Sequence, residues 1–281
     1  MTPADQPQAP VIVRIPEWER YKWLRHGFSI RSNGTSRVYG GSTLNLGWTK
    51  EDDPAAVAEN RRQFVQAING ERGPSALVTL RQIHSATVHR VKEEDGALEG
   101  RLQTAEGKAV LEGDGLITDQ PAVLLAVGTA DCVPVLVVDI EKRVVAAYHA
   151  GWRGTAAQIV EQGIATMREE YGTRVEDLMA AIGPGIGPCC YTIGEEVRNA
   201  FSQRFRYADC LFHQRESRAY LNLWEANRQQ LLHAGLTNRQ IAVVAECSAC
   251  TRDENGNLRY FSHRGEHGVA GRMLNVVGII P

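Results

Sequence analysis

Two histidines and one cysteine lie at or near the ends of strand-like segments, and their side chains suit a metal site. Cys132 directly precedes one apolar run, His149 closes the next, and His84 lies in a third, β-branched segment. A thiolate with two imidazoles is a donor set that zinc accepts, and three protein ligands leave a fourth position for water or substrate. The pattern therefore predicts an open zinc site at these three residues.

Two other interpretations use the same residues. His84 and His149 could be hydrogen-bonded core histidines and Cys132 a small buried residue, since cysteine is often buried. Cys132 could instead be a nucleophile with His149 as its base, the ring being oriented by Asp131 or another acceptor. Residue spacing alone leaves all three interpretations open.

The predicted fold brings these residues together through a hairpin. Residues 133–149 read as two buried strands joined by a charged turn, which returns His149 close to Cys132. Further strands are predicted at 21–31, 76–91, 178–182, 241–247 and 273–280, and on both sides of Asp119-Gln120-Pro121. Helices are predicted at 52–68, at 156–172 with Thr155 as N-cap, at 194–205 and at 222–235. We expect a mixed α/β (α+β) fold, a mixed β-sheet core flanked by helices.

Domain organisation follows from the absence of an internal linker or short repeat. We expect residues 1–12 to form a short flexible tail and residues 13–281 to form one catalytic domain. Composition is that of an ordinary globular chain, with 43% hydrophobic and 23% charged residues.

Several polar or glycine-rich segments are ambiguous. Arg153 follows the HAGW segment before a predicted helix, where it could bind an anion or simply stack on Trp152. The GPGIGP segment at 183–188 favours a stiff turn over a phosphate loop, because proline has no N–H donor. In the loop at 260–273, Phe261 could stack on a base and Arg272 could bind phosphate.

The remaining cysteines offer two pairs, Cys189-Cys190 and Cys247-Ser248-Ala249-Cys250. Either pair could be half of a zinc site or a redox motif, but no second CxxC motif accompanies them. We therefore expect packed or incidental thiols at both places.

The blocks of this sequence resemble one known family. They are HGFSIR, STLNLG, DDPAAVAENRRQF, GTADCVPVL, AAYHAGWRGT, IGPGIGPCCYTIGEEV and YFSHRGEHGVAGR, in that order. They are similar to the signature blocks of the YfiH family, whose members are labelled laccase-domain proteins, multicopper polyphenol oxidases, purine nucleoside phosphorylases or peptidoglycan editing factors. The resemblance covers residues 25–280, and the HAGWRG block with TADC upstream is its most specific part.

This resemblance implies a YfiH-like single domain with a zinc ion held by His84, Cys132 and His149. Ser85 stands where the family has a glycine after the first of these histidines. The resemblance also points to four residues that would line the pocket: Asn45, Arg61, Arg153 and Arg272.

The implied activity is zinc-dependent purine nucleoside phosphorolysis, in which adenosine, inosine or methylthioadenosine and phosphate give the base and ribose 1-phosphate. A side activity as adenosine deaminase is also implied, although the H-x-E…C-x-x-C signature of zinc deaminases is absent. Phosphorolysis needs an anion site, a sugar pocket and electrophilic help, which the arginines, Asn45 or backbone groups, and zinc would supply.

Three alternatives to phosphorolysis remain. The first is a Cys–His amidohydrolase that edits peptidoglycan precursors. The second is a copper-dependent, laccase-like polyphenol oxidase, which the eight histidines and the absence of any His-x-His pair disfavour; Cu²⁺ could still occupy the zinc site. The third is a binding or assembly module with a structural zinc, whose fourth ligand would come from Cys189, Cys190, Cys247 or a partner chain.

The charge and hydropathy of the chain constrain its partners and location. The net charge of −2 gives no reason to expect nucleic acid or an anionic membrane as a partner. No apolar run approaches the roughly 20 residues that span a bilayer, and the first ten residues lack the features of a signal peptide. We expect a cytoplasmic enzyme, a monomer or small homo-oligomer, whose partners are a purine nucleoside and phosphate.

Overall fold

The computed structural model describes residues 9–70 and 76–281, and its centre is a pair of β-sheets packed face to face. The first sheet runs in the order β1 (Ile12–Val13), β2 (Leu24–Ser29), β15 (Met273–Ile279), β7 (Val123–Thr129) and β4 (Ala76–Val78). The second runs in the order β14 (Ile241–Val243), β10 (Leu178–Ile182), β8 (Val133–Asp139), β9 (Val144–Ala150), β6 (Gly115–Thr118) and β5 (Val88–Arg90).

Both sheets are mixed. The pairs β4–β7, β5–β6 and β10–β14 are parallel, whereas the central pairs, such as β8–β9 and β7–β15, are antiparallel. A smaller antiparallel sheet of β11 (Thr192–Ile193), β13 (Arg218–Leu221) and β12 (Phe212–Arg215) lies to one side, and β3 (Ser32–Ser36) stands apart from the three sheets.

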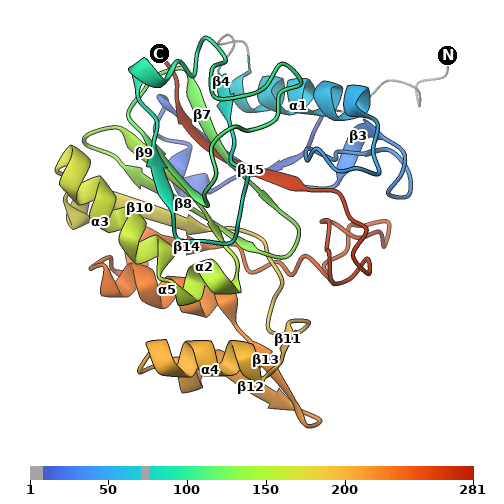
Figure 1. Ribbon diagram of the computed structural model, residues 1–281, viewed down its shortest axis with the longest axis vertical. Coiled ribbons are helices and arrows are strands. Elements are labelled where there is room, and N and C mark those ends of the chain that lie inside the picture. Colours follow the sequence, from blue (N-terminus) through green and yellow to red (C-terminus); the bar gives the residue numbers. More distant parts are fainter. Residues whose placement is uncertain (1–8, 71–75) are drawn as a thin grey trace.

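Helices cover the outer face of each large sheet, as Figure 1 shows. The helices are α1 (Pro54–Asn69), α2 (Trp152–Ala156), α3 (Ile159–Tyr171), α4 (Glu195–Arg204) and α5 (Leu223–His233). Short 3-10 turns occupy Pro16–Trp18, Glu93–Asp95, Val175–Asp177, Ala208–Leu211 and Asn238–Gln240. Helix α1 packs on the first sheet through Phe64 and Ile68, while α3 and α5 pack on the second.

The alternation of side chains in β8 shows how the layers are built. Leu136 and Val138 face the first sheet, whereas Val135 and Val137 face the helices. Successive residues of a strand point to opposite faces, so a strand with protein on both sides must be apolar throughout. All seven residues of β8 and of β9 are buried, which explains the uninterrupted apolar runs in the sequence.

The predicted fold class, a mixed α+β core flanked by helices, is confirmed. The 133–149 hairpin forms as predicted, and α1 begins after Asp53, whose carboxylate accepts a hydrogen bond from the Ala55 N–H. Gly172 ends α3 in a left-handed conformation (φ 62°). Residues 1–8 of the predicted tail lie outside the described residues, and Ile12 pairs with Ser29; the domain boundary at 13 stays a prediction.

Two predicted elements are wrong in a way that matters for function. The single strand expected at 76–91 is two short strands, β4 in the first sheet and β5 in the second, joined by a crossover that carries His84. Thr155 does not cap the following helix: it lies inside α2, and a separate helix α3 starts after Gln158 (φ 62°). A third element, the hairpin of β12 and β13, was not predicted, because its residues do not alternate strongly between apolar and polar.

None of the described helices has both the length and the apolar character that crossing a membrane requires.

Candidate metal centre and pocket

His84, Cys132 and His149 converge at one edge of the two sheets. One nitrogen of each histidine and the Cys132 Sγ atom all lie within 4.8 Å of one another. The β8–β9 pairing explains half of this convergence, because Pro134 pairs with His149 and Cys132 immediately precedes that strand. The crossover between the sheets brings His84 to the same edge, where its ring lies 5.1 Å from that of His149 between centroids.

The crossover that carries His84 is held against β7 by hydrogen bonds from the Gln82 side chain, in place of backbone pairing between strands. The Gln82 amide donates to the Gly128 carbonyl (2.8 Å) and accepts from the Gly128 N–H (2.7 Å), as a neighbouring strand would. Two residues later, His84 has a left-handed backbone (φ 59°). The left-handed residue is therefore His84 and not Ser85, so the serine at the family's glycine position fits without backbone strain.

Asp114 is the buried acceptor that orders this edge. One carboxylate oxygen, Oδ1, accepts from His149 Nδ1 (2.8 Å) and the His84 N–H (3.0 Å). The other, Oδ2, accepts from the N–H (2.6 Å) and hydroxyl (2.8 Å) of Ser85. Burial alone would raise the pKa of Asp114, but the hydrogen bonds from His149 and Ser85 outweigh it and lower the pKa to about 2.

The Asp114 contact also determines which nitrogen of His149 is available. Because Nδ1 bonds to the carboxylate, Nε2 faces Cys132 and is the nitrogen that can bind a metal. This carboxylate–imidazole pairing is typical of metal-binding histidines.

Cys132 and His149 form a coupled acid–base pair when no metal is bound. Burial would raise the pKa of Cys132, but the charge of His149 and hydrogen bonds from both histidines lower it to about 6. Burial would lower the pKa of His149, but the Cys132 thiolate and Asp114 raise it to about 9. Between these values the pair is a thiolate and an imidazolium sharing one proton.

The residue before the cysteine, Asp131, is also held in an unusual conformation (φ 96°). Its carboxylate accepts from the hydroxyls of Ser248 (2.7 Å) and Ser262 (2.6 Å) and from the Arg264 N–H (2.7 Å). Its backbone carbonyl accepts from the Ile186 N–H (2.7 Å). Asp131 is thus engaged by these loops and does not orient the His149 ring, which bonds to Asp114 instead.

The three donors fit a tetrahedral metal with one open position. Catalytic zinc sites likewise use three protein ligands drawn from histidine, cysteine and carboxylates, and all three side chains here line one cavity. Space for the centre depends on Gly151, because a Cβ atom there would lie 2.9 Å from Cys132 Sγ and 3.2 Å from His84 Cδ2.

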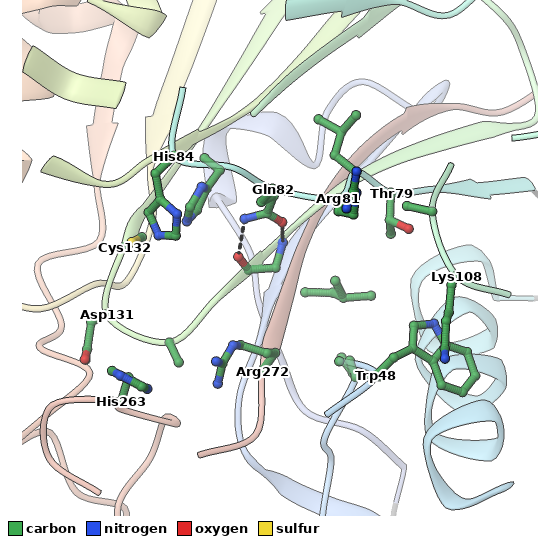
Figure 2. A pocket seen from close by; sticks show the side chains of 18 of the residues that line it. Trp48, Thr79, Arg81, Gln82, His84, Lys108, Asp131, Cys132, His263 and Arg272 are labelled. Carbon is green, nitrogen blue, oxygen red and sulfur yellow. Dashed lines mark hydrogen bonds between the residues drawn. The ribbon is translucent and has the colours of Figure 1, made fainter. Parts of the chain in front are cut away.

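The cavity measures about 700 Å³, enough for a ligand the size of a nucleoside with a phosphate group. Figure 2 shows His84 and Cys132 at one end, Trp48 and Lys108 at the other, and Arg272 between them. Apolar wall is contributed by Leu46, Leu80, Ile186 and Leu274.

Positive charge dominates the described lining of the cavity. It contains Arg61, Arg81, Lys108, Arg264 and Arg272, with Asp131 as the one acidic side chain. Arg81 forms an ion pair with Glu112, which reduces its own contribution. Burial lowers the pKa of Arg61 to about 10, so its guanidinium stays charged at neutral pH. The net charge of −2 for the whole chain therefore does not indicate the positive charge of this pocket.

Two of the predicted pocket residues line this cavity, namely Arg61 and Arg272. Arg61 donates to the Leu46 carbonyl (3.0 Å) and lies 5.4 Å from the centroid of the Trp48 ring. Arg272 donates to the carbonyls of Ala270 (2.6 Å) and Gly271 (3.0 Å).

Three other predicted pocket residues lie outside the described lining. Asn45 is fully buried, where its amide bonds to Asp52 (2.7 Å) and accepts from the Arg272 N–H (2.8 Å), so it supports Arg272 from behind. Phe261 is also fully buried, edge-on to Tyr39, and exposes no face to a base. Arg153 stacks on Trp152 (4.2 Å), the simpler of the two interpretations drawn from the sequence.

Sequence reasoning missed Asp114, Gln82, Trp48 and the cations Arg81, Lys108 and Arg264. Only Asp114 had a detectable signal, because a charged residue directly before a short apolar strand often emerges at a strand end. The other side chains occupy loops whose positions depend on tertiary packing.

Comparison with known proteins places the chain in a family. The sequence profile of the family described as "Multi-copper polyphenol oxidoreductase laccase" matches residues 25–280. The chain belongs to this family. "Purine nucleoside phosphorylase YlmD" of Geobacillus stearothermophilus is 35% identical over 94% of this chain and 97% of its own length.

Two further relatives extend this comparison. "Adenosine deaminase RL5" of an unknown prokaryotic organism is 37% identical over 62% of this chain and 66% of its own length. The crystal structure of the hypothetical protein YfiH of Bacillus licheniformis superposes with a TM-score of 0.85, at 32% identity, covering 98% of both chains. The predicted membership of the YfiH family is confirmed.

Our first prediction concerns Asp114→Asn. The substitution weakens the hydrogen bond that orients His149 and places an amide N–H₂ beside the donors of Ser85. We expect zinc affinity, measured by competition with a chromophoric chelator, to fall about 10–100-fold. Asp119→Asn, on the exposed turn after β6, is the matched control and should leave the affinity unchanged. A folded Asp114→Asn protein with normal zinc affinity would contradict the orienting role.

A second prediction follows from the proton shared by Cys132 and His149. At pH 7–9 the metal-free pair holds one proton, because Cys132 has lost its proton above pH 6 and His149 keeps its own up to pH 9. Zinc must displace that proton, so its affinity should rise about tenfold per pH unit from 7 to 9 and level off above 9. Calorimetry in buffers with different ionisation enthalpies should record about one proton released at pH 8; no release would disprove the pairing.

Proposed function

We propose that this protein is a zinc-dependent purine nucleoside phosphorylase that converts adenosine, inosine or methylthioadenosine and phosphate into the base and a ribose 1-phosphate. The observation that carries the proposal is a three-donor metal centre opening onto a cavity with five lysine and arginine side chains. The names of relatives that match nearly the whole chain support the same activity.

The positive side chains suit the phosphate. In phosphorolysis a phosphate oxygen bonds to C1′ of the ribose, while the bond from C1′ to the base breaks and its electron pair leaves with the base. Arg272 lies between the metal donors and Trp48, and the Arg264 N–H bonds to Asp131, the neighbour of Cys132, whereas Lys108 and Arg61 lie towards Trp48. Guanidinium groups bind phosphate with paired hydrogen bonds, so we assign the phosphate to Arg272 and Arg264.

The apolar walls suit the purine. Trp48 is half-buried at the end of the cavity away from His84, and its indole N–H donates to the Gly107 carbonyl (3.0 Å). We assign Trp48, and not Phe261, as the aromatic surface that contacts the base. Tyr191 lines the same cavity, and burial raises its pKa to about 12. Its hydroxyl therefore keeps its proton at neutral pH and can donate a hydrogen bond to the departing base.

His84, Cys132 and His149 would hold the zinc ion, which when bound supplies a Lewis acid for an oxygen or nitrogen of the reactants. The cysteine contributes a thiolate, and Asp114 keeps the His149 ring in one orientation through Nδ1. Cu²⁺ is an alternative occupant, since it binds such donors more tightly than zinc does. We further propose that the enzyme works in the cytoplasm and acts on small molecules alone.

A second activity, deamination of adenosine, has one observation in its favour: the relative named adenosine deaminase matches 62% of this chain. The same open metal position would serve water as the reactant in place of phosphate.

The decisive test is base release from adenosine, inosine and methylthioadenosine with and without phosphate, alongside metal analysis of the same sample. We expect release to require phosphate, with ribose 1-phosphate formed in equal amount. Cys132→Ala should lose the zinc held by His84 and His149 and at least about 10³-fold in turnover, because removal of one of three ligands abolishes the open site. Cys210→Ser changes an exposed cysteine that is not among the candidate metal donors, and it is the matched control.

Other outcomes of that test would redirect the assignment. Ammonia release without phosphate would make the deaminase the main activity. Full phosphate-dependent turnover by Cys132→Ala would refute the metal mechanism. Equal iodoacetamide labelling of Cys132 in zinc-loaded and zinc-depleted protein would favour the Cys–His amidohydrolase, which needs a free thiolate.

A further prediction isolates the phosphate site. Arg272→Gln keeps hydrogen-bonding capacity but removes the charge, so we expect kcat/KM for phosphate to fall about 10–100-fold. Zinc content should not change, since Arg272 belongs to the cavity wall and not to the metal donors. Arg252→Gln, which changes an exposed arginine in the segment between β14 and β15, provides the matched control. An unchanged KM for phosphate in Arg272→Gln would remove this residue from the anion site.

A further inference from the structure

A second group of potential ligands lies outside the centre described above. The Sγ atoms of Cys189, Cys190, Cys247 and Cys250 all lie within 4.8 Å of one another. The two pairs are far apart in the chain, and their sequence pattern predicts packed or incidental thiols. The fold brings the turn after β10 against the loop after β14.

The spacing of the sulfur atoms is that of a metal site and not of disulfides. Four sulfurs placed tetrahedrally at about 2.3 Å from a zinc ion stand about 3.8 Å apart. Cys189 Sγ and Cys250 Sγ are 3.6 Å apart, whereas a disulfide requires about 2.0 Å. All four thiols are free.

Backbone contacts hold the two loops in register around this group. Gly185 bridges to Cys247 in the manner of parallel strands, and the Ser248 N–H donates to the Gly185 carbonyl (3.0 Å). The Gly187 N–H donates to Cys247 Sγ (3.2 Å), a contact that stabilises a metal-bound thiolate. All four N–H groups of the GPGIGP turn have acceptors: Gly185 and Gly187 donate to the loop after β14, and Gly183 and Ile186 donate to the carbonyls of Pro134 and Asp131. This excludes the phosphate-loop interpretation.

The burial of the cysteines suits a structural ion. Cys247 is buried and Cys190 half-buried, while Cys189 and Cys250 are exposed, so an ion can enter from solution. Four protein ligands leave no open position, which distinguishes this group from the three-donor centre. The two groups share no residue.

We propose that Cys189, Cys190, Cys247 and Cys250 bind a second, structural zinc ion as four thiolates. The ion ties the turn after β10, which forms part of the cavity wall, to the loop after β14, which supports Asp131. Ile186 and Tyr191 of the first segment line that cavity, and Ser248 of the second donates to Asp131, the neighbour of Cys132. The proposal is independent of the enzymatic activity, because it concerns a different set of ligands.

The test uses the full-length Cys132→Ala protein, in which the first centre has lost its thiolate. After reduction and dialysis against excess zinc and then metal-free buffer, we expect about one zinc per chain. X-ray absorption at the zinc edge should show four sulfur neighbours at about 2.3 Å. Adding Cys189→Ser and Cys250→Ser should reduce the bound zinc at least tenfold, whereas adding Cys210→Ser should leave it at one.

Thermal unfolding provides a second readout. A strong chelator should lower the Tm of Cys132→Ala but not that of the variant that also lacks Cys189 and Cys250. If that variant fails to fold, the X-ray absorption of Cys132→Ala still decides the matter. Absence of zinc from reduced Cys132→Ala, a zinc ion with nitrogen or oxygen neighbours, or mass-spectrometric detection of stable disulfides among the four cysteines would overturn the proposal.

Discussion

The hydrogen bond between the Asp114 carboxylate and His149 Nδ1 is the contact on which the candidate metal centre depends. The same carboxylate accepts from the backbone of His84 and from Ser85, so one buried anion positions two of the three donors. An anion without partners would be costly in such a place, and its stability there comes from these charge-assisted bonds. These bonds fix the positions of His84 and His149 relative to each other.

Asp131 performs the matching role on the other side of Cys132. Its carboxylate and carbonyl bond to the loops that contain Ser248, Ser262, Arg264 and Ile186. Left-handed backbone at a non-glycine residue is unfavourable, and at both His84 and Asp131 a set of side-chain and backbone bonds compensates for it. Through the contacts of Asp114 and Asp131, the edge that carries Cys132 and His149 is bonded to the crossover with His84, to the turn after β10 and to the loops that contain Ser248 and Ser262.

The charge distribution shows why composition says little about the ligand. A nearly neutral chain concentrates five cationic side chains around one cavity, while most of its carboxylates lie elsewhere. An anionic group entering that cavity meets a favourable potential that the protein as a whole does not project. The cavity combines this charge with apolar walls and Trp48, so it can accept a molecule that is part phosphate and part aromatic base.

Apolar periodicity and residue chemistry are local properties, so the amino-acid sequence by itself determined the 133–149 hairpin and most helices and strands. It also singled out His84, Cys132 and His149 as residues whose types suit a metal, but their spacing left their roles open. It could not reveal Asp114 as the partner of His149, the crossover that splits residues 76–91 between two sheets, or the meeting of Cys189-Cys190 with Cys247 and Cys250. It also placed Asn45 and Phe261 in the pocket, whereas packing buries both beneath it. These features depend on how the two sheets lie against each other, since residues far apart in the chain become neighbours only when the sheet faces bury their apolar side chains together.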